Sequence, residues 1–361
     1  MTAESFKNRL IEYLEAEGMS RNENNIAKLL IKNIDTKNYE ISYDNLGSII
    51  FHKKSKNKNA PKFLVAAHMD EVGFLVKSID SNGQILLDAV GGIWPNVVIG
   101  TKATLISSDG KRHQGVFGHT SIHIMERDKA KLAVTMKDLY ADFGFINKED
   151  TLNHNVEVGN LVLMSGETIR FTNQDLVGGK AMDNRAGVCT LEYIANKLAN
   201  EDLGVDLYLV GTVQEEVGER GAKAVATLID SDIAIALDTT SSHDTLGCIQ
   251  GTTKIGYGAA LRIMDRGMLS DPRLIEYICK IGRENKIPHY KFVAMGGGTD
   301  GAMLQYSKGG AAITTISLPQ RYLHSPIGVC SIKDLMSAGD LIVETIKSMN
   351  SDIYDKILKY K

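Results

Sequence analysis

Hydrophobic positions change their period several times along the first part of the chain. Apolar residues recur every three or four positions over 3–17 and 24–34, which predicts two amphipathic helices. Over 41–51 they alternate with polar residues, which predicts a β-hairpin. Residues 63–67 then form a continuous apolar run, which is typical of a strand buried on both faces of a parallel sheet. His68 follows this predicted strand directly.

The remainder of the chain divides into two regions with different patterns. From about Val72 to Arg170 the sequence reads as short strands separated by turn signals such as Ser81-Asn82-Gly83. From about Leu176 onward, helical patterns alternate with apolar strands, which is typical of an α/β fold. The expected elements of this last region are helix 185–199, strand 206–213, a helix near 221–230, strand 233–237, helix 272–285, strand 311–317 and helix 332–348.

These patterns predict an α/β domain that is interrupted by a β domain. Residues 1–71 and 171–361 are expected to form a doubly wound, mostly parallel sheet with helices on both faces. Residues 72–170 are expected to form a small inserted all-β, barrel-like domain.

Composition narrows the class of protein. Of the 361 residues, 43% are hydrophobic and 24% are charged, and the net charge of -3 gives no basic excess that would recommend nucleic acid as a partner. No apolar run approaches the roughly 20 residues needed to span a bilayer, and the first residues lack the apolar core of a secretion signal. The four cysteines form no C-x-x-C pair, so a reduced, cytoplasmic setting is expected.

Six histidines and acids are placed where an α/β sheet gathers its functional groups. In open α/β sheets the carboxyl ends of the strands line one crevice, so residues far apart in sequence converge there. Asp183 enters from the loop before the predicted helix 185–199, and the other residues follow predicted strands. The set comprises His68, Asp183, Glu215, Glu216, Asp238 and His324.

Two imidazoles and four carboxylates without a thiolate suit one or two divalent ions, with zinc favoured and cobalt or manganese possible. If Asp183 bridges two ions about 3.5–4 Å apart, each ion takes one histidine and one further carboxylate, and one glutamate remains as general base. Glu215 and Glu216 point to opposite sides of an extended chain, so one would ligate while the other reaches the reacting water. Asp70, two residues beyond His68, would hold the imidazole and fix its tautomer.

Five segments of the chain resemble motifs of the M42 metallo-aminopeptidases, a family that includes glutamyl aminopeptidases and tetrahedral aminopeptidase assemblies. The resemblance covers essentially the whole chain, and the segments occur in the family's order. They are His68-Met69-Asp70-Glu71-Val72-Gly73, Ala181-Met182-Asp183-Asn184-Arg185-Ala186-Gly187, Val213-Gln214-Glu215-Glu216-Val217-Gly218, Gly297-Gly298-Thr299-Asp300 and Arg321-Tyr322-Leu323-His324-Ser325-Pro326.

The resemblance assigns roles that the residue pattern leaves open. It implies that His68 and Asp238 bind one metal, that Glu216 and His324 bind the other, and that Asp183 bridges them. Glu215 would be the general base that takes a proton as a metal-bridging hydroxide attacks the first peptide bond of a substrate with a free N-terminus. The resemblance also implies that the β insertion forms a pocket wall and supports a homo-oligomer, built from dimers up to a dodecamer.

The preferred N-terminal residue stays open, because the chain departs from the family pattern at Gly256–Ala260, at Gln320 and at Gly118–His123, none of which is an expected ligand. The candidates for recognising an acidic side chain are Arg220, Lys254, Arg262 and Arg321.

Three rival functions fit part of the same pattern. The metals would also serve a deacylase of N-acyl amino acids or small amides. A glycoside hydrolase would use two of the carboxylates without a metal. A non-catalytic assembly protein would retain the site without using it.

Overall fold

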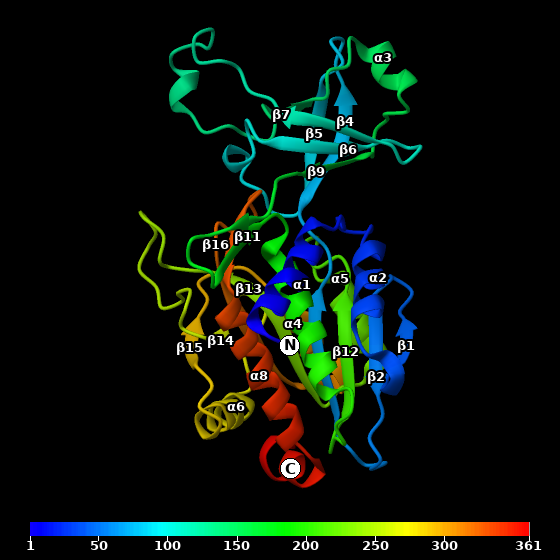
Figure 1. Cartoon of the computed structure of the whole chain (residues 1–361), viewed down its shortest axis with the longest axis vertical. Helices are drawn as coiled ribbons and strands as arrows, with labels where there is room; N and C mark the ends of the chain where they lie inside the picture. Colours follow the sequence, from blue (N-terminus) through cyan, green and yellow to red (C-terminus); the bar gives the residue numbers. More distant parts are fainter. Residues whose placement is uncertain (361) are drawn as a thin grey trace.

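The computed structural model describes residues 1–360, which form an α/β body with a separate barrel above one end of its sheet (Figure 1). The body contains one eleven-stranded sheet. Its strands are β1 (Glu40–Tyr43), β2 (Ile49–Lys53), β3 (Lys62–His68), β10 (Ile169–Arg170), β11 (Leu176–Gly179), β12 (Asp206–Thr212), β13 (Ile233–Ser241), β14 (Ala259–Met264), β15 (His289–Val293), β16 (Ala312–Arg321) and β17 (Gly328–Ser331).

The centre of this sheet is parallel and its edges are antiparallel. The main strand order is β1-β2-β12-β3-β13-β16-β17-β11-β10, with β14 pairing with β15 and β16 outside this path. Strands β12, β3, β13 and β16 run parallel to one another, so their carboxyl ends lie at the same edge. Because β12 pairs with β3 up to Thr212 opposite His68, the residues that follow both strands emerge side by side.

Helices cover both faces of the sheet, and the side chains of β3 show why. Phe63 and Val65 point into the larger core beneath α1, α4 and α8, whereas Leu64 and Ala66 point into the core beneath α5 and α7. A strand buried on both faces therefore reads as an unbroken apolar run. The helices are α1 (Ala3–Glu15), α2 (Asn24–Asn33), α3 (Lys148–Asn153), α4 (Met182–Leu198), α5 (Arg220–Ile229), α6 (Pro272–Glu284), α7 (Gly301–Leu304), α8 (Ile332–Ser348) and α9 (Ser351–Ile353).

A closed six-stranded antiparallel barrel, in the order β4-β5-β8-β7-β6-β9, lies between β3 and β10 in the sequence. It has its own core, in which the rings of Phe74 and Phe117 pack 5.1 Å apart between their centroids. Helix α3 joins β8 to β9. The strands are β4 (Gly73–Ile79), β5 (Ile85–Val90), β6 (Lys102–Ile106), β7 (Arg112–Phe117), β8 (Tyr140–Asp142) and β9 (Leu161–Met164).

The predicted fold class, an α/β domain with an inserted barrel-like β domain, is confirmed. Strands β13 and β16 run four residues past the predicted ends at 237 and 317. The added residues of β13 are polar, and Asp238, Thr239 and Thr240 are buried and paired with β16, a continuation that a hydrophobic pattern does not detect. The added residues Leu318–Gln320 of β16 are the partners of Thr239–Ser241. Strands β14 and β15 were not predicted either. Within residues 1–360, no helix combines the length and apolar character needed to cross a membrane.

The buried guanidinium of Arg185 ties the start of α4 to the end of β3. It donates to the backbone carbonyl of Met69 at 3.1 Å and to the carboxylate of Glu71 at 3.1 Å. It also donates to three carbonyls at and after the end of α1, those of Tyr13, Ala16 and Gly18. Lys180 binds both oxygens of the same Glu71 carboxylate, at 2.9 and 2.8 Å. This charged cluster joins three chain segments: the end of α1, the residues that follow β3, and the start of α4.

Replacing Arg185 with methionine should remove the guanidinium that offsets Glu71 and that donates to the carbonyls of Tyr13 and Met69. The carbonyls of Ala16 and Gly18 would each keep one other donor. Breaking a buried ion pair by removing one partner typically costs about 3–5 kcal/mol, and we expect a loss of that size in the free energy of unfolding, measured by urea titration. Arg170→Met, which removes an exposed arginine paired with Glu4, is the control and should cost less than about 1 kcal/mol. Equal stabilities of the two variants would contradict this account.

Candidate metal centre

Neighbouring strand ends bring together the side chains predicted to carry the chemistry. His68 is the last residue of β3, and Glu215 and Glu216 follow the end of β12. Asp238 lies within β13, beside β3, and not after the strand as the sequence predicted. His324 comes from the loop after β16. Residues separated by more than 250 positions in the chain therefore face one another.

Asp183 reaches the same place from a distorted start of α4. Its backbone is not helical, with φ -82° and ψ 110°, and the peptide bond to Asn184 is cis. The Asn184 amide nitrogen donates to the carbonyl of Leu237 at 2.8 Å, and its amide oxygen accepts from the backbone of Gly187 at 3.0 Å. Asn184 thus anchors this turn to β13, next to Asp238.

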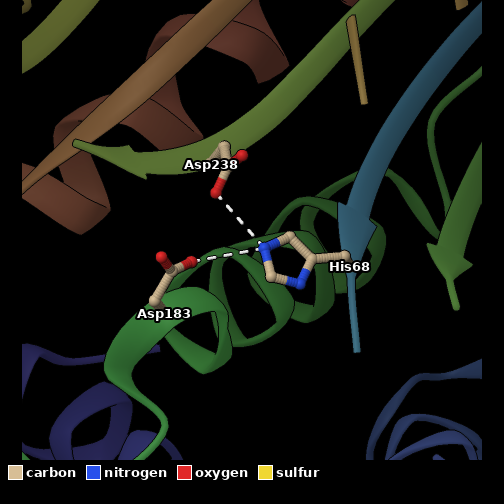
Figure 2. A group of neighbouring side chains, drawn as sticks. All are labelled: His68, Asp183 and Asp238. Carbon is tan, nitrogen blue, oxygen red and sulfur yellow. Dashed lines mark ion pairs between the residues drawn. The ribbon is translucent and has the colours of Figure 1, made fainter. Parts of the chain in front are cut away.

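Asp183 and Asp238 lie on either side of one nitrogen of His68 (Figure 2). The Nε2 atom of His68 is 3.2 Å from Asp183 Oδ1 and 3.4 Å from Asp238 Oδ1. Glu215 Oε2 is more distant from the same nitrogen, at 3.9 Å. The carboxylates come from α4 and β13, which are separate elements of the chain.

The second oxygen of Asp183 faces the other histidine. His324 Nε2 is 3.1 Å from Asp183 Oδ2 and 3.4 Å from Glu216 Oε1. On its other side, His324 Nδ1 donates to the carbonyl of Gly92 at 2.6 Å, which fixes the ring and leaves Nε2 directed at the carboxylates. Gly92 lies between β5 and β6, so a loop of the barrel holds this ring.

Asp70 lies behind the cluster and is completely buried. Its Oδ1 atom is 3.4 Å from His68 Nδ1 and accepts the backbone N–H of Glu215 at 3.0 Å. Its Oδ2 atom accepts the N–H of Glu216 at 3.2 Å. Asp70 therefore contacts both the imidazole and the turn that carries the glutamates, whereas the sequence suggested only the first contact.

Burial and crowding of like charges control the ionisation of these groups. Burial, together with the charges of Asp238 and Glu216, raises the pKa of Glu215 well above its usual value. Burial, with a contribution from Asp183, raises the pKa of Glu216 to about 8. Burial opposes protonation of His324, but Asp183 and Glu216 raise its pKa to about 10. Burial and the nearby acids thus make both glutamates harder to ionise, while the same acids favour the protonated form of His324.

The residues present fit a metal ion. Asp183 Oδ1 and Glu216 Oε1 are buried and have no hydrogen-bond partner within the described chain. Both histidines turn Nε2 toward carboxylates while Nδ1 faces an acceptor, which is the arrangement of metal-ligating histidines. Ligand atoms of His68, Asp183 and Asp238 lie within 4.8 Å of one another, as do those of Asp183, Glu216 and His324. A third such group joins His68, Glu215 and Glu216.

A cavity of about 580 Å³ opens onto the cluster. Its wall includes apolar side chains of β15 and the loop after it, among them Phe292, Val293 and Met295. Of the four cations considered for substrate recognition, Arg262 lines this cavity but is held by Asp265 at 3.1 Å. Arg321 is instead paired with Asp244 at 2.6 Å.

Three buried supporting residues were missed by the sequence reasoning. Ser20 donates to Asp70 at 2.6 Å, and Glu23 accepts the backbone N–H of Gln214 at 3.1 Å. Asp300, at the end of the glycine loop, accepts from the Thr212 hydroxyl at the end of β12. Ser20 and Glu23 lie in an ordinary helix connection, and nothing in their local pattern indicates a contact with residues 50 and 191 positions away.

Comparison with known proteins shows which family the chain belongs to. A profile of the M42 glutamyl aminopeptidase family matches residues 47–341. The glutamyl aminopeptidase of Lactococcus lactis subsp. cremoris is 33% identical over 323 residues, with 89% of this chain and 90% of that protein covered.

Solved structures show the same fold over the whole chain. An aminopeptidase from the archaeon Desulfurococcus kamchatkensis has a TM-score of 0.93 at 28% identity, with 99% of both chains covered. The TET1 peptidase of Pyrococcus horikoshii, which can assemble into a tetrahedron or a large octahedral shell, has a TM-score of 0.85 at 27% identity, with 95% of this chain and 100% of that chain covered. The resemblance predicted from five motifs is confirmed: the chain belongs to the M42 glutamyl aminopeptidase family and is a hydrolase that acts on peptides.

Proposed function

We propose that the protein is a two-metal aminopeptidase, and one observation carries the proposal. The two carboxylate oxygens of Asp183 face different imidazoles, Oδ1 toward His68 and Oδ2 toward His324. A carboxylate in this position suits a bridge between two divalent ions. His68 and Asp238 would hold one ion, and Glu216 and His324 the other. The oxygen and nitrogen ligands suit zinc or cobalt, with manganese as a further option.

The remaining glutamate suits proton transfer. When bound, the ions would polarise the scissile carbonyl and lower the pKa of water. Glu215 belongs to neither of the groups that contain Asp183 and lines the cavity, so its carboxylate is available to take a proton from water and return it to the leaving amine. Asp70 would not contact the substrate; it would orient the His68 imidazole and hold the backbone of Glu215.

The size of the cavity supports removal of single residues from peptide ends. About 580 Å³ is in the range of small-molecule sites and accommodates one or a few residues. The proposed substrates are therefore peptides with a free N-terminus, whose first side chain would enter the cavity beside Phe292 and Met295.

Glu215→Gln tests the assignment of the base. The amide keeps the shape of the side chain but cannot accept the proton, so kcat should fall by a factor on the order of 10² or more, while metal content stays close to that of the unaltered protein. Hydrolysis of aminoacyl-anilides, with metal measured by mass spectrometry, checks both. Glu284→Gln, an exposed change on α6, is the control. Full activity of the Glu215 variant would exclude it as the base.

The same assay separates the proposed activity from the rival functions. Free-amine anilides should be cleaved and their N-acetylated counterparts should not. The opposite preference would indicate a deacylase, and activity that survives removal of metal by a chelator would contradict a metallo-aminopeptidase.

We also propose that the chain forms a homo-oligomer, with dimers assembling to a dodecamer. Two observations support this: the tetrahedral assembly of the TET1 peptidase of Pyrococcus horikoshii, and the apolar side chains exposed between β7 and β8 of the barrel. These are Ile122, Ile124 and Leu132, which are 70, 81 and 71% exposed. The barrel would thus contribute to assembly as well as to the pocket, where Gly92 already contacts His324.

Light scattering of the purified protein should give a mass near twelve times the chain mass of 39.5 kDa. A dimer at low protein concentration would be consistent with stepwise assembly. A mass equal to that of one chain at all micromolar concentrations would contradict the proposed oligomer.

We further propose that the protein works in the reducing environment of the cytoplasm. The four cysteines, Cys189, Cys248, Cys279 and Cys330, are all free, and three of them are buried. Burial raises the pKa of the Cys189 thiol well above its usual value, which keeps that sulfur unreactive.

A further inference from the structure

The turn that carries Glu215 and Glu216 is held by carboxylates. It lies between the end of β12 at Thr212 and the start of α5 at Arg220, and Gln214 has a positive φ of 57°. The N–H groups of three consecutive residues each donate to a carboxylate oxygen. Gln214 donates to Glu23 Oε1 at 3.1 Å, and Glu215 and Glu216 donate to the two oxygens of Asp70 at 3.0 and 3.2 Å.

Glu23 comes from a distant part of the chain and does not line the cavity. It lies 191 positions before Gln214, in the connection between α1 and α2, and only 5% of it is exposed. Its Oε1 atom also accepts the backbone N–H of Arg21 at 2.8 Å. Ser20, in the same connection, donates to Asp70 Oδ2 at 2.6 Å. The connection between α1 and α2 therefore supplies one of the two carboxylates that hold the turn, Glu23, and binds the other, Asp70.

The carboxylate of Glu23 could either cap helix α2 or hold the turn after β12. Glu23 is the N-cap residue of α2, where a side chain normally accepts from the first helical N–H groups. Its side chain makes no such cap bond. The buried carboxylate is instead directed across to the turn that follows β12. Outside its own connection, the carboxylate therefore binds the turn that carries Glu215 and Glu216, and it does not cap its own helix.

We propose that Glu23 is a positioning residue for hydrolysis. By accepting the N–H of Gln214, it sets the backbone from which the side chains of Glu215 and Glu216 project into the cluster. A buried N–H that loses its acceptor costs about 1–3 kcal/mol, so the bond to Glu23 favours this backbone position, and a displacement of about 1 Å at a reacting group can cost 10²-fold in rate. The proposal rests on the function proposed above, because the rate it affects is that of the aminopeptidase reaction.

Glu23→Ala and Glu23→Gln test the proposal together. The alanine variant loses the acceptor, so kcat on an aminoacyl-anilide should fall roughly 10- to 100-fold, with KM changed less than about threefold. The glutamine variant keeps an oxygen at the same position and should retain kcat within about threefold. Glu23→Asp, which is one methylene shorter, should fall between them and replaces the alanine variant if that variant does not fold.

Two further measurements separate positioning from loss of stability. Asp271→Ala removes a carboxylate that accepts two backbone N–H groups at the start of α6, at 2.8 and 3.3 Å, and should leave kcat unchanged. Hydrogen–deuterium exchange of the peptide covering 213–217 should be faster in Glu23→Ala than in the unaltered protein, and unchanged in Glu23→Gln.

Unaltered kcat in Glu23→Ala, or an equal loss in the glutamine variant, would overturn the proposal. An inactive unaltered protein would instead overturn the proposed function. In that case the exchange measurement still decides whether Glu23 holds the turn, because unchanged exchange in Glu23→Ala would reject it.

Discussion

Four carboxylates buried around two imidazoles impose the constraint on which this structure depends. Like charges this close, removed from water, repel one another unless protons or cations offset them. Burial, with a contribution from Asp183, raises the pKa of Glu216 to about 8, and Asp183 and Glu216 raise the pKa of His324 to about 10 against the effect of burial. A pair of divalent ions would offset the negative charge of the ionised carboxylates.

The support for the cluster comes from several layers of the fold. The parallel strands β12, β3 and β13 end at one edge and set the spacing of the ligands. Arg185 and Lys180 hold the chain just beyond His68 through Glu71, and Asp70 joins the imidazole to the glutamate turn. The barrel adds the carbonyl that orients His324. Residues from both parts of the molecule therefore determine the geometry of a single site.

Most of the fold follows from local sequence patterns, because strands buried on two faces and amphipathic helices leave strong periodic signals. The apolar run at 63–67 predicts β3, and the helix at 332–348 has the bounds of α8. The last four residues of β13 and of β16 and the strands β14 and β15 were missed, because they are stabilised by pairing between distant segments. Hydrophobic periodicity contains no information about such pairing. The six clustered residues were predictable from their places near strand ends. Ser20 and Glu23 were not, because their partners, the Asp70 carboxylate and the backbone N–H of Gln214, lie 50 and 191 positions away in the sequence.

Anomalous diffraction from crystals grown with zinc tests the central claim most directly. The account predicts two peaks in each chain, about 3.5–4 Å apart, with Asp183 in contact with both. One peak should lie beside His68 and Asp238, and the other beside Glu216 and His324. A single peak, or two peaks of which Asp183 contacts only one, would contradict the two-metal site.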